Sequence, residues 1–334
     1  MAKTVLALLL SIAAFPGIQT AYAQQFTMKL SSPTINDVTH EWMKAFKAGV
    51  ESRSNARMKV EIYPANQLGQ IPATIEGVAL GTIEFTAPAV GFLNSLDPRF
   101  QTLDAAGLFD SIEHGQKVLT DPDIRRRLSE FGERAGVEPL ITFLNGPMTL
   151  VSHRPVRNVA DMKGLKLRVP GAAALHVEPF KKVGAIPVSL PLGEVLPALQ
   201  NKGIDGAVAG FTVFTAFKYY DVARSATFLP GTWLVAAGMV NRQFLKSLGP
   251  DLEAIVRDEA KKAEVVFSTY GVTDIARIRD VWESNRGEAI SMSADDARVY
   301  LDQVTSVVPG VLQNNPKMKQ DYDALTAASR RYRQ

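Results

Sequence analysis

The segment DMKGLKLRVPG, residues 161–171, has the pattern of a short buried strand followed by a turn. Apolar side chains alternate with Lys166 and Arg168, and Pro170-Gly171 ends the run. Arg168 therefore lies at the carboxyl end of the strand, where α/β proteins bind ligands in a crevice beyond the sheet. Its planar guanidinium matches a carboxylate through paired hydrogen bonds. The residues alone leave two interpretations open, a ligand clamp and a buried salt bridge to Glu194 or Asp205.

Short apolar runs alternate with helical patterns along the chain, which indicates an α/β fold with largely parallel sheets. The pattern over 250–286, interrupted only by Gly271, would form a helix of about 50 Å, long enough to cross two lobes. The helix over 39–54 has Thr39 as its expected N-cap. Strands are predicted over residues 26–32, 58–64, 82–89, 137–145, 148–153, 165–170, 185–191, 204–211, 225–230, 233–241 and 289–293. Further helices are predicted over residues 73–81, 112–119, 123–135, 173–184 and 193–203.

The N-terminal residues have the pattern of a secretory signal. Lys3 supplies the positive start, residues 5–14 the apolar core, and Ala21-Tyr22-Ala23 a small-x-small cleavage site. An apolar run this short cannot span a bilayer, which needs about 20 residues. We therefore expect cleavage after Ala23, a mature chain that begins at Gln24, and a periplasmic location. The mature length suggests two lobes rather than one core.

Composition and charge exclude several classes of protein. The chain has no cysteine, which rules out a disulfide scaffold, a thiolate metal site and a cysteine nucleophile. Its 37 Lys and Arg residues against 34 Asp and Glu leave a net charge of +3. The basic triplet 125–127 is followed by Glu130 and Glu133, as on a solvated helix face. No nucleic-acid partner is predicted, because such binding would need a clustered basic stripe.

The common catalytic motifs are absent from the sequence, including G-x-S-x-G, G-x-x-x-x-G-K-[ST], G-x-G-x-x-G and H-E-x-x-H. The Asp295-Asp296 pair stands at an expected helix start, where capping explains it. We therefore predict that the protein is not an enzyme and that it uses no metal, nucleotide or prosthetic group. The histidines are scattered without metal-ligand spacing: His40, His114, His153 and His176.

Two longer stretches carry a resemblance to a known family. RPVRNVADMKGLKLRVPG (154–171) and GAIPVSLPLGEVLPALQNKGIDGA (184–207) resemble the core signature of TRAP-transporter solute-binding proteins of the DctP type. Other segments are similar to family segments in the same order, so the resemblance covers nearly all of the mature chain. They are LSSPT (30–34), YPANQLGQ (63–70), GVALGTIEFT (77–86), LFDSIEHGQKVL (108–119) and the stretch 217–248.

The resemblance implies a type II-like, two-lobe periplasmic binding protein with mostly parallel sheets, hinge strands and a long domain-spanning helix. Lobe I is expected to comprise residues 24–147 and about 236–275, and lobe II residues 148–235 and about 276–334, with the ligand cleft between them. It also implies a monomer that captures an organic acid and delivers it to TRAP-type permease subunits in the membrane. Arg168 is then the clamp for the ligand carboxylate.

The chain departs from the family pattern where relatives supply polar ligand contacts. The family reads D-G-Q-E-N-P where this chain has DGAVAG (205–210), so Ala209 replaces an asparagine. The other polar or aromatic positions fall at or near Pro147, Ala89-Val90 and Leu192. These apolar or small residues predict a monocarboxylate with an apolar or aromatic body. A C4-dicarboxylate is the alternative if another cation such as Lys218 reaches the site.

Five further residues are candidates for ligand contact, and four of them have a plain structural alternative. Phe211 and Trp233 offer an aromatic wall or simple core packing, and Asn145 a ligand donor or a turn. Ser32 offers its hydroxyl or a helix cap, and Val90 follows the third strand. Two rival functions are considered. An exported enzyme that anchors an organic acid on Arg168 would need a nucleophile or an acid/base pair near Arg168, and the sequence offers none. A periplasmic sensor would use the same capture chemistry as a transport protein.

Overall fold

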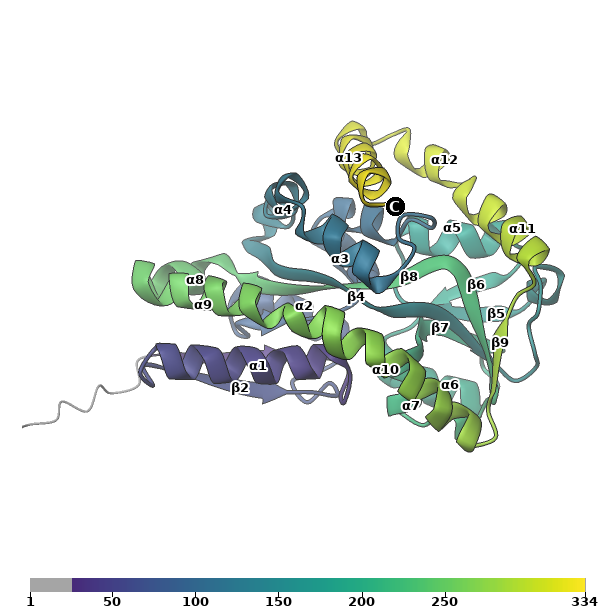
Figure 1. The fold of residues 1–334 in the computed structure, drawn as a ribbon, viewed down its shortest axis with the longest axis horizontal. Coiled ribbons are helices and arrows are strands. Elements are labelled where there is room, and N and C mark those ends of the chain that lie inside the picture. The colour runs from purple at the N-terminus through teal and green to yellow at the C-terminus, as the bar shows by residue number, and fades with distance from the viewer. Residues whose placement is uncertain (1–25, 334) are drawn as a thin grey trace, which may run out of the picture.

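The computed structural model describes residues 26–333, and its strands form one mixed sheet (Figure 1). The order across the sheet is β2-β1-β3-β8-β4-β7-β5-β6, with β9 paired to β8. The strands are β1 (Phe26–Ser31), β2 (Met58–Tyr63), β3 (Phe85–Thr86), β4 (Val137–Ser152), β5 (Lys166–Val169), β6 (Ile186–Ser189), β7 (Gly206–Gly210), β8 (Ser225–Asn241) and β9 (Glu288–Ser291).

Helices connect most of the strands, as the alternating sequence pattern predicts. The α-helices are α1 (Val38–Arg53), α2 (Ile71–Leu80), α3 (Ile112–Thr120), α4 (Pro122–Leu128), α5 (Ala174–Lys182), α6 (Leu192–Gln200), α7 (Phe211–Ala216), α8 (Arg242–Ser247), α9 (Gly249–Ala263), α10 (Val265–Ser284), α11 (Ala294–Thr305), α12 (Val308–Leu312) and α13 (Pro316–Tyr332). The 3₁₀ turns are η1 (Val90–Ser95), η2 (Pro98–Asp104), η3 (Glu133–Ala135), η4 (Ala160–Met162) and η5 (Tyr219–Asp221).

The long antiparallel strands β4 and β8 form the centre of the sheet, paired from Val137 with Asn241 to Ser152 with Ser225. On one flank β1, β2 and β3 are parallel to each other, and on the other β5, β6 and β7 are parallel. β3 and β7 run in opposite directions and both end toward the middle of β4. The carboxyl ends of both flanks therefore converge near Asn145, and the predicted α/β fold is confirmed.

The predicted breaks in the two central strands are wrong. The sequence predicts separate strands on either side of Gly146-Pro147 and of Gly231-Thr232, but β4 and β8 each continue through these residues. The pairing of β4 with β8 shifts register around Gly146 and Pro147 instead. A glycine or proline that reads as the end of a strand is here accommodated by a bulge.

The predicted long helix is present, but it is interrupted at another residue. α9 ends at Ala263 and α10 begins at Val265, while Gly271 lies inside α10 with Val38 and Ile112 as its neighbours. Figure 1 shows α9 and α10 running in sequence along the molecule, and they pack against α1 near one end and against α7 and β9 near the other. The segment therefore braces elements from both flanks of the sheet.

The start of α1 differs from the prediction in a way that affects the site. Asp37, not Thr39, is the N-cap, because its side chain accepts a hydrogen bond from the backbone N–H of His40 at 3.1 Å. Further along α1, Trp42 is buried and stacks on Phe85 of β3 at a centroid distance of 5.4 Å. This packing fixes α1 on the sheet. Because Asp37 is the N-cap, the Thr39 hydroxyl has no capping role.

The predicted signal peptide, residues 1–23, lies outside the residues that the structure describes. Within residues 26–333, no helix has the length and apolar character that a bilayer crossing needs. The lobe boundaries stay a prediction. Of the C-terminal helices, α11 packs against α5 and β8, whereas α13 packs against η2, α3 and α4.

An ion pair between the buried Arg99 and the half-buried Asp97 anchors η2. Arg99 contacts Asp97 at 2.7 Å between Nη2 and Oδ2, and the same nitrogen donates to the backbone oxygen of Glu130 at 2.8 Å. Burial alone would raise the pKa of Asp97, but hydrogen bonds from Arg99 and from the backbone N–H of Gly132 outweigh it. The pKa of Asp97 is therefore lowered overall.

Asp97→Asn is expected to reduce the free energy of unfolding at pH 7 by about 1 kcal/mol, a typical net value for such hydrogen bonds. A carboxylate with a lowered folded pKa stabilises the protein above its unfolded pKa of about 4 and loses this effect as the pH falls. The variant should therefore lose less stability than wild type when the pH is lowered from 7 to 2, because only wild type has this carboxylate to protonate. Urea unfolding at both limits tests this, and an equal loss in the two proteins would contradict it.

Candidate functional site

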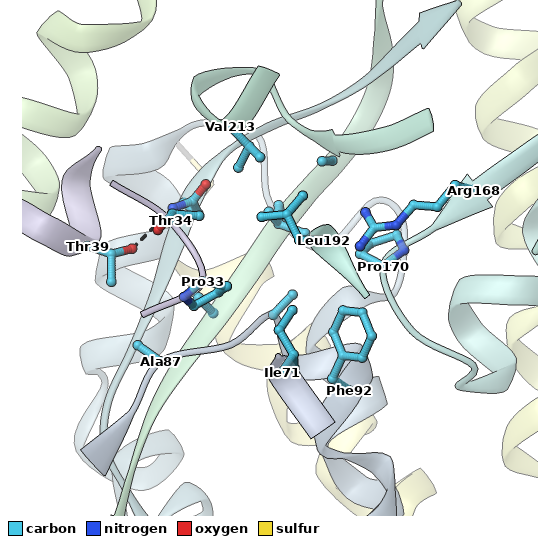
Figure 2. A pocket seen from close by; sticks show the side chains of 15 residues that line it. Pro33, Thr34, Thr39, Ile71, Ala87, Phe92, Arg168, Pro170, Leu192 and Val213 are labelled. Atoms are coloured by element: carbon cyan, nitrogen blue, oxygen red, sulfur yellow. Dashed lines mark hydrogen bonds between the residues drawn. The ribbon is translucent and has the colours of Figure 1, made fainter. Parts of the chain in front are cut away.

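A cavity lies where the carboxyl ends of both flanks approach the middle of β4 (Figure 2). It contains about 420 Å³ of space between protein atoms, part of it open to solvent. Of the described residues that line it, Arg168 alone is charged, and Thr34, Thr39 and Asn145 supply the other polar side chains. The remaining lining is apolar: Pro33, Ile71, Ala87, Ala89, Phe92, Pro170, Leu192, Ala209, Val213, Leu234 and Ala236.

β5 carries Arg168 into this cavity, as the alternation in residues 165–169 predicts. The residue is only 2% exposed. Its Nε donates to the backbone oxygen of Leu190 at 3.0 Å and its Nη1 to that of Val208 at 2.9 Å. Figure 2 shows the guanidinium directed into the cavity near Phe92, whose ring centroid lies 5.9 Å from Cζ. Two backbone carbonyls therefore hold the guanidinium in one orientation.

Arg168 has no ion-pair partner among the described residues. Of the five N–H donors of an arginine, the hydrogen bonds to Leu190 and Val208 use two. Glu194 forms no ion pair with it, and Asp205 instead accepts a hydrogen bond from the backbone N–H of Lys166 at 2.8 Å. The buried salt bridge that the sequence left open is therefore not formed. Burial lowers the pKa of Arg168 to about 10, so the guanidinium remains charged at neutral pH.

Asn145 lines the cavity, as its position at the end of a predicted strand suggests, but its amide is occupied by protein partners. Its Nδ2 donates to Asp37 Oδ2 at 3.0 Å and to Thr39 Oγ1 at 3.3 Å. Its Oδ1 accepts from the hydroxyl of Thr212 at 3.2 Å. The side chain thus connects the start of α1 with the start of α7.

Two other predicted residues lie beside the lining without belonging to it. Ser32 is fully buried, and its Oγ lies 3.0 Å from Oγ1 of Thr34, which does line the cavity. Val90 is also fully buried, directly after the lining residue Ala89. Neither residue is part of the cavity lining.

The predicted aromatic wall of Phe211 and Trp233 does not line the cavity. Phe211 is fully buried and packs edge-to-face on Phe228 at a centroid distance of 5.0 Å. Trp233 donates from Nε1 to the backbone oxygen of Phe109 at 2.8 Å. In this structure both rings therefore have the packing role that was the alternative for each.

The aromatic side chain that lines the cavity is Phe92, which the sequence analysis missed. It lies in η1, after the short strand β3, and no pattern around it distinguishes it from other apolar residues. Ile71 at the start of α2 and Val213 in α7 were missed for the same reason. Of the positions that depart from the family pattern, Ala89, Leu192 and Ala209 line the cavity, whereas Pro147 does not.

The family model described as bacterial extracellular solute-binding protein, family 7, or DctP, matches residues 31–308. The chain belongs to this family. Its described members include TRAP periplasmic solute-binding proteins, and the predicted resemblance is thereby confirmed. The family description is that of solute-binding proteins rather than enzymes.

Curated relatives match parts of the chain. A solute-binding protein of Roseobacter denitrificans is 33% identical over 56% of this chain and 57% of its own length. The 2,3-diketo-L-gulonate-binding periplasmic protein YiaO of Escherichia coli is 27% identical over 68% of this chain and 69% of its own. The C4-dicarboxylate-binding periplasmic protein DctP of Rhodobacter capsulatus is 26% identical over 71% and 77%.

Solved structures share the fold along nearly the whole chain. A TRAP periplasmic solute-binding protein from Desulfovibrio salexigens with bound orotic acid superposes with a TM-score of 0.86 at 21% identity. The match covers 92% of this chain and 99% of that protein. A relative from Shewanella oneidensis with bound succinate gives a TM-score of 0.83 at 23% identity, over 91% and 99%. At these identities the structures establish the fold and leave the ligand open.

Proposed function

We propose that this protein binds a monocarboxylate with a largely apolar or aromatic body and that Arg168 clamps the carboxylate. The observation that carries the proposal is a buried guanidinium that faces an apolar cavity with no carboxylate partner among the described residues. An unpaired buried charge is costly. A ligand carboxylate would supply the missing partner and accept the unused N–H donors.

The charge around the cavity favours one ligand carboxylate over two. A second buried carboxylate would need its own cationic partner, and Lys218 is not among the lining residues. The far end of the cavity lies next to the Asp37 carboxylate, which is joined to Asn145 by a hydrogen bond of 3.0 Å. A second negative charge at that end would be repelled, which makes a C4-dicarboxylate the second candidate.

The remaining parts of the proposal follow the family. The mature chain would begin at Gln24 in the periplasm, and its two lobes would close on the ligand, as periplasmic binding proteins do. The protein would then deliver the acid to TRAP-type permease subunits as a monomer. Neither nucleic acid nor a cofactor has a part in this function.

Ligand selectivity tests the proposal directly. Benzoate or a branched 2-oxo acid is expected to bind at least about tenfold more tightly than succinate, because an unpaired second carboxylate costs more than 1.4 kcal/mol. Isothermal titration calorimetry with protein refolded from denaturant, to remove any acid acquired during expression, gives the affinities. Tight binding of succinate alone would favour the C4-dicarboxylate alternative. Mass spectrometry of the small molecules released on denaturation would identify the natural acid.

A further inference from the structure

The end of the cavity opposite Arg168 carries an unused hydrogen-bond donor. Figure 2 shows Thr34 and Thr39 on one side of the cavity and Arg168 on the other, with Leu192 and Ile71 between them. Thr39 lines the cavity and is 1% exposed. What its hydroxyl can do depends on the hydrogen bonds that surround it.

Asp37 fixes the orientation of the Asn145 amide. Its Oδ1 accepts from the backbone N–H of His40 at 3.1 Å, and its Oδ2 lies 3.0 Å from Nδ2 of Asn145. A carboxylate only accepts hydrogen bonds, so the amide must turn its NH₂ group toward it. The other N–H of the same group then points to Thr39 Oγ1 at 3.3 Å, and Oδ1 accepts from Thr212. Both amide donors are thereby used.

Thr39 must therefore act as an acceptor toward Asn145, and its own O–H hydrogen points elsewhere. No described residue accepts that hydrogen. The neighbouring hydroxyl of Thr34 shares a hydrogen bond of 3.0 Å with Ser32 Oγ, in which either oxygen can be the donor. A buried hydroxyl hydrogen without an acceptor is unfavourable, and a group placed in the cavity is in a position to satisfy it.

We propose that Thr39 donates a hydrogen bond to a neutral oxygen at the end of the ligand distal to the carboxylate. This inference rests on the proposed function and narrows its ligand class to monocarboxylates with an apolar middle and a distal hydroxyl, ether or carbonyl oxygen. A distal carboxylate is disfavoured because the Asp37 carboxylate lies directly behind Asn145. The cavity would then bind the charged end, the apolar body and the neutral polar end of the ligand at three different places.

Two probes of similar shape isolate the distal contact, 4-methoxybenzoate and 4-ethylbenzoate, since only the first has an oxygen acceptor there. Wild type is expected to bind the methoxy acid about three- to tenfold more tightly, as for one neutral hydrogen bond. Thr39→Val should abolish this preference, whereas Thr39→Ser, which keeps the donor, should retain it. Calorimetry gives the affinities, and thermal melting confirms that each variant is folded.

The outcomes separate this inference from the proposed function. If both acids bind through Arg168 but wild type does not prefer the methoxy acid, or Thr39→Val keeps the preference, the role of Thr39 is wrong and the clamp stands. If neither acid binds to wild type, the proposed function and this inference both fail. The comparison of the two acids on wild type needs no variant, so it decides the question even if Thr39→Val does not fold.

Discussion

Arg168→Ala is expected to weaken the binding of benzoate by about 2–5 kcal/mol, the range for the loss of one partner of a buried charge pair. This corresponds to a factor of about 30 to 5,000 in the dissociation constant. The variant removes the charged group of the lining, the single one among residues 26–333, and leaves the ligand carboxylate in an apolar cavity. Arg168→Lys keeps the charge but loses the planar fork and the paired anchoring to Leu190 and Val208, so its affinity should lie between the two.

Calorimetry with benzoate on wild type and both variants measures this effect. Arg298→Ala is a suitable control, because Arg298 is an exposed arginine paired with Asp295 on α11 and its removal changes the net charge equally. The control should bind like wild type. Unchanged affinity in Arg168→Ala, with the fold verified by melting, would show that the carboxylate is held elsewhere.

The position of Arg168 could be predicted because strand alternation and the rule for carboxyl ends are both local in sequence. Its lack of an ion-pair partner could not be predicted, since the sequence offers both Glu194 and Asp205 as partners. In the structure neither residue forms an ion pair with Arg168. The Asp205 carboxylate, directly before β7, accepts a hydrogen bond from the backbone N–H of Lys166 in the neighbouring strand β5. A side chain's availability is decided by its neighbours in space, and these are far apart in the chain.

Asn145 and Phe92 are two further residues whose roles depend on contacts in space that the local sequence does not show. Asn145 lines the cavity, but Asp37, 108 residues earlier, uses one of its donors, and its contact with a ligand stays a prediction. Phe92 was passed over because η1 has no periodicity that marks an inward face. The aromatic residues that sequence reasoning preferred, Phe211 and Trp233, follow or begin strands near the crevice, yet pack against Phe228 and Phe109.

Two loops from opposite flanks of the sheet contribute Phe92 and Pro170 to the cavity lining. Gly91 in η1 follows β3, and Gly171 follows β5. A Cβ atom on Gly171 would lie 2.5 Å from the backbone carbon and oxygen of Gly91. Nearby, Nε2 of His176 lies 2.6 Å from Oδ2 of Asp104, with both side chains buried. The two loops therefore meet backbone to backbone, and only glycine permits this approach at position 171.

Gly171→Ala is accordingly expected to weaken ligand binding by about 1–3 kcal/mol, the usual cost of overpacking, without touching the ligand. Gly164→Ala is the matched control, because Gly164 also has a positive φ, +74°, but a Cβ there would meet nothing within 4 Å. Both variants carry backbone strain, and only the first obstructs the contact between the loops.

Small-angle scattering distinguishes the two effects. If the lobes close over the acid, wild type and Gly164→Ala should shrink when benzoate is added, and Gly171→Ala should shrink less while releasing the ligand faster. Backbone strain lowers the stability of open and closed forms alike, so it changes melting temperature in both variants but affinity in neither. Obstruction of a contact that is made only on closure lowers the affinity alone. Wild-type affinity in Gly171→Ala would mean that these loops do not meet when the ligand is bound, and that the clamp at Arg168 operates without closure at this rim.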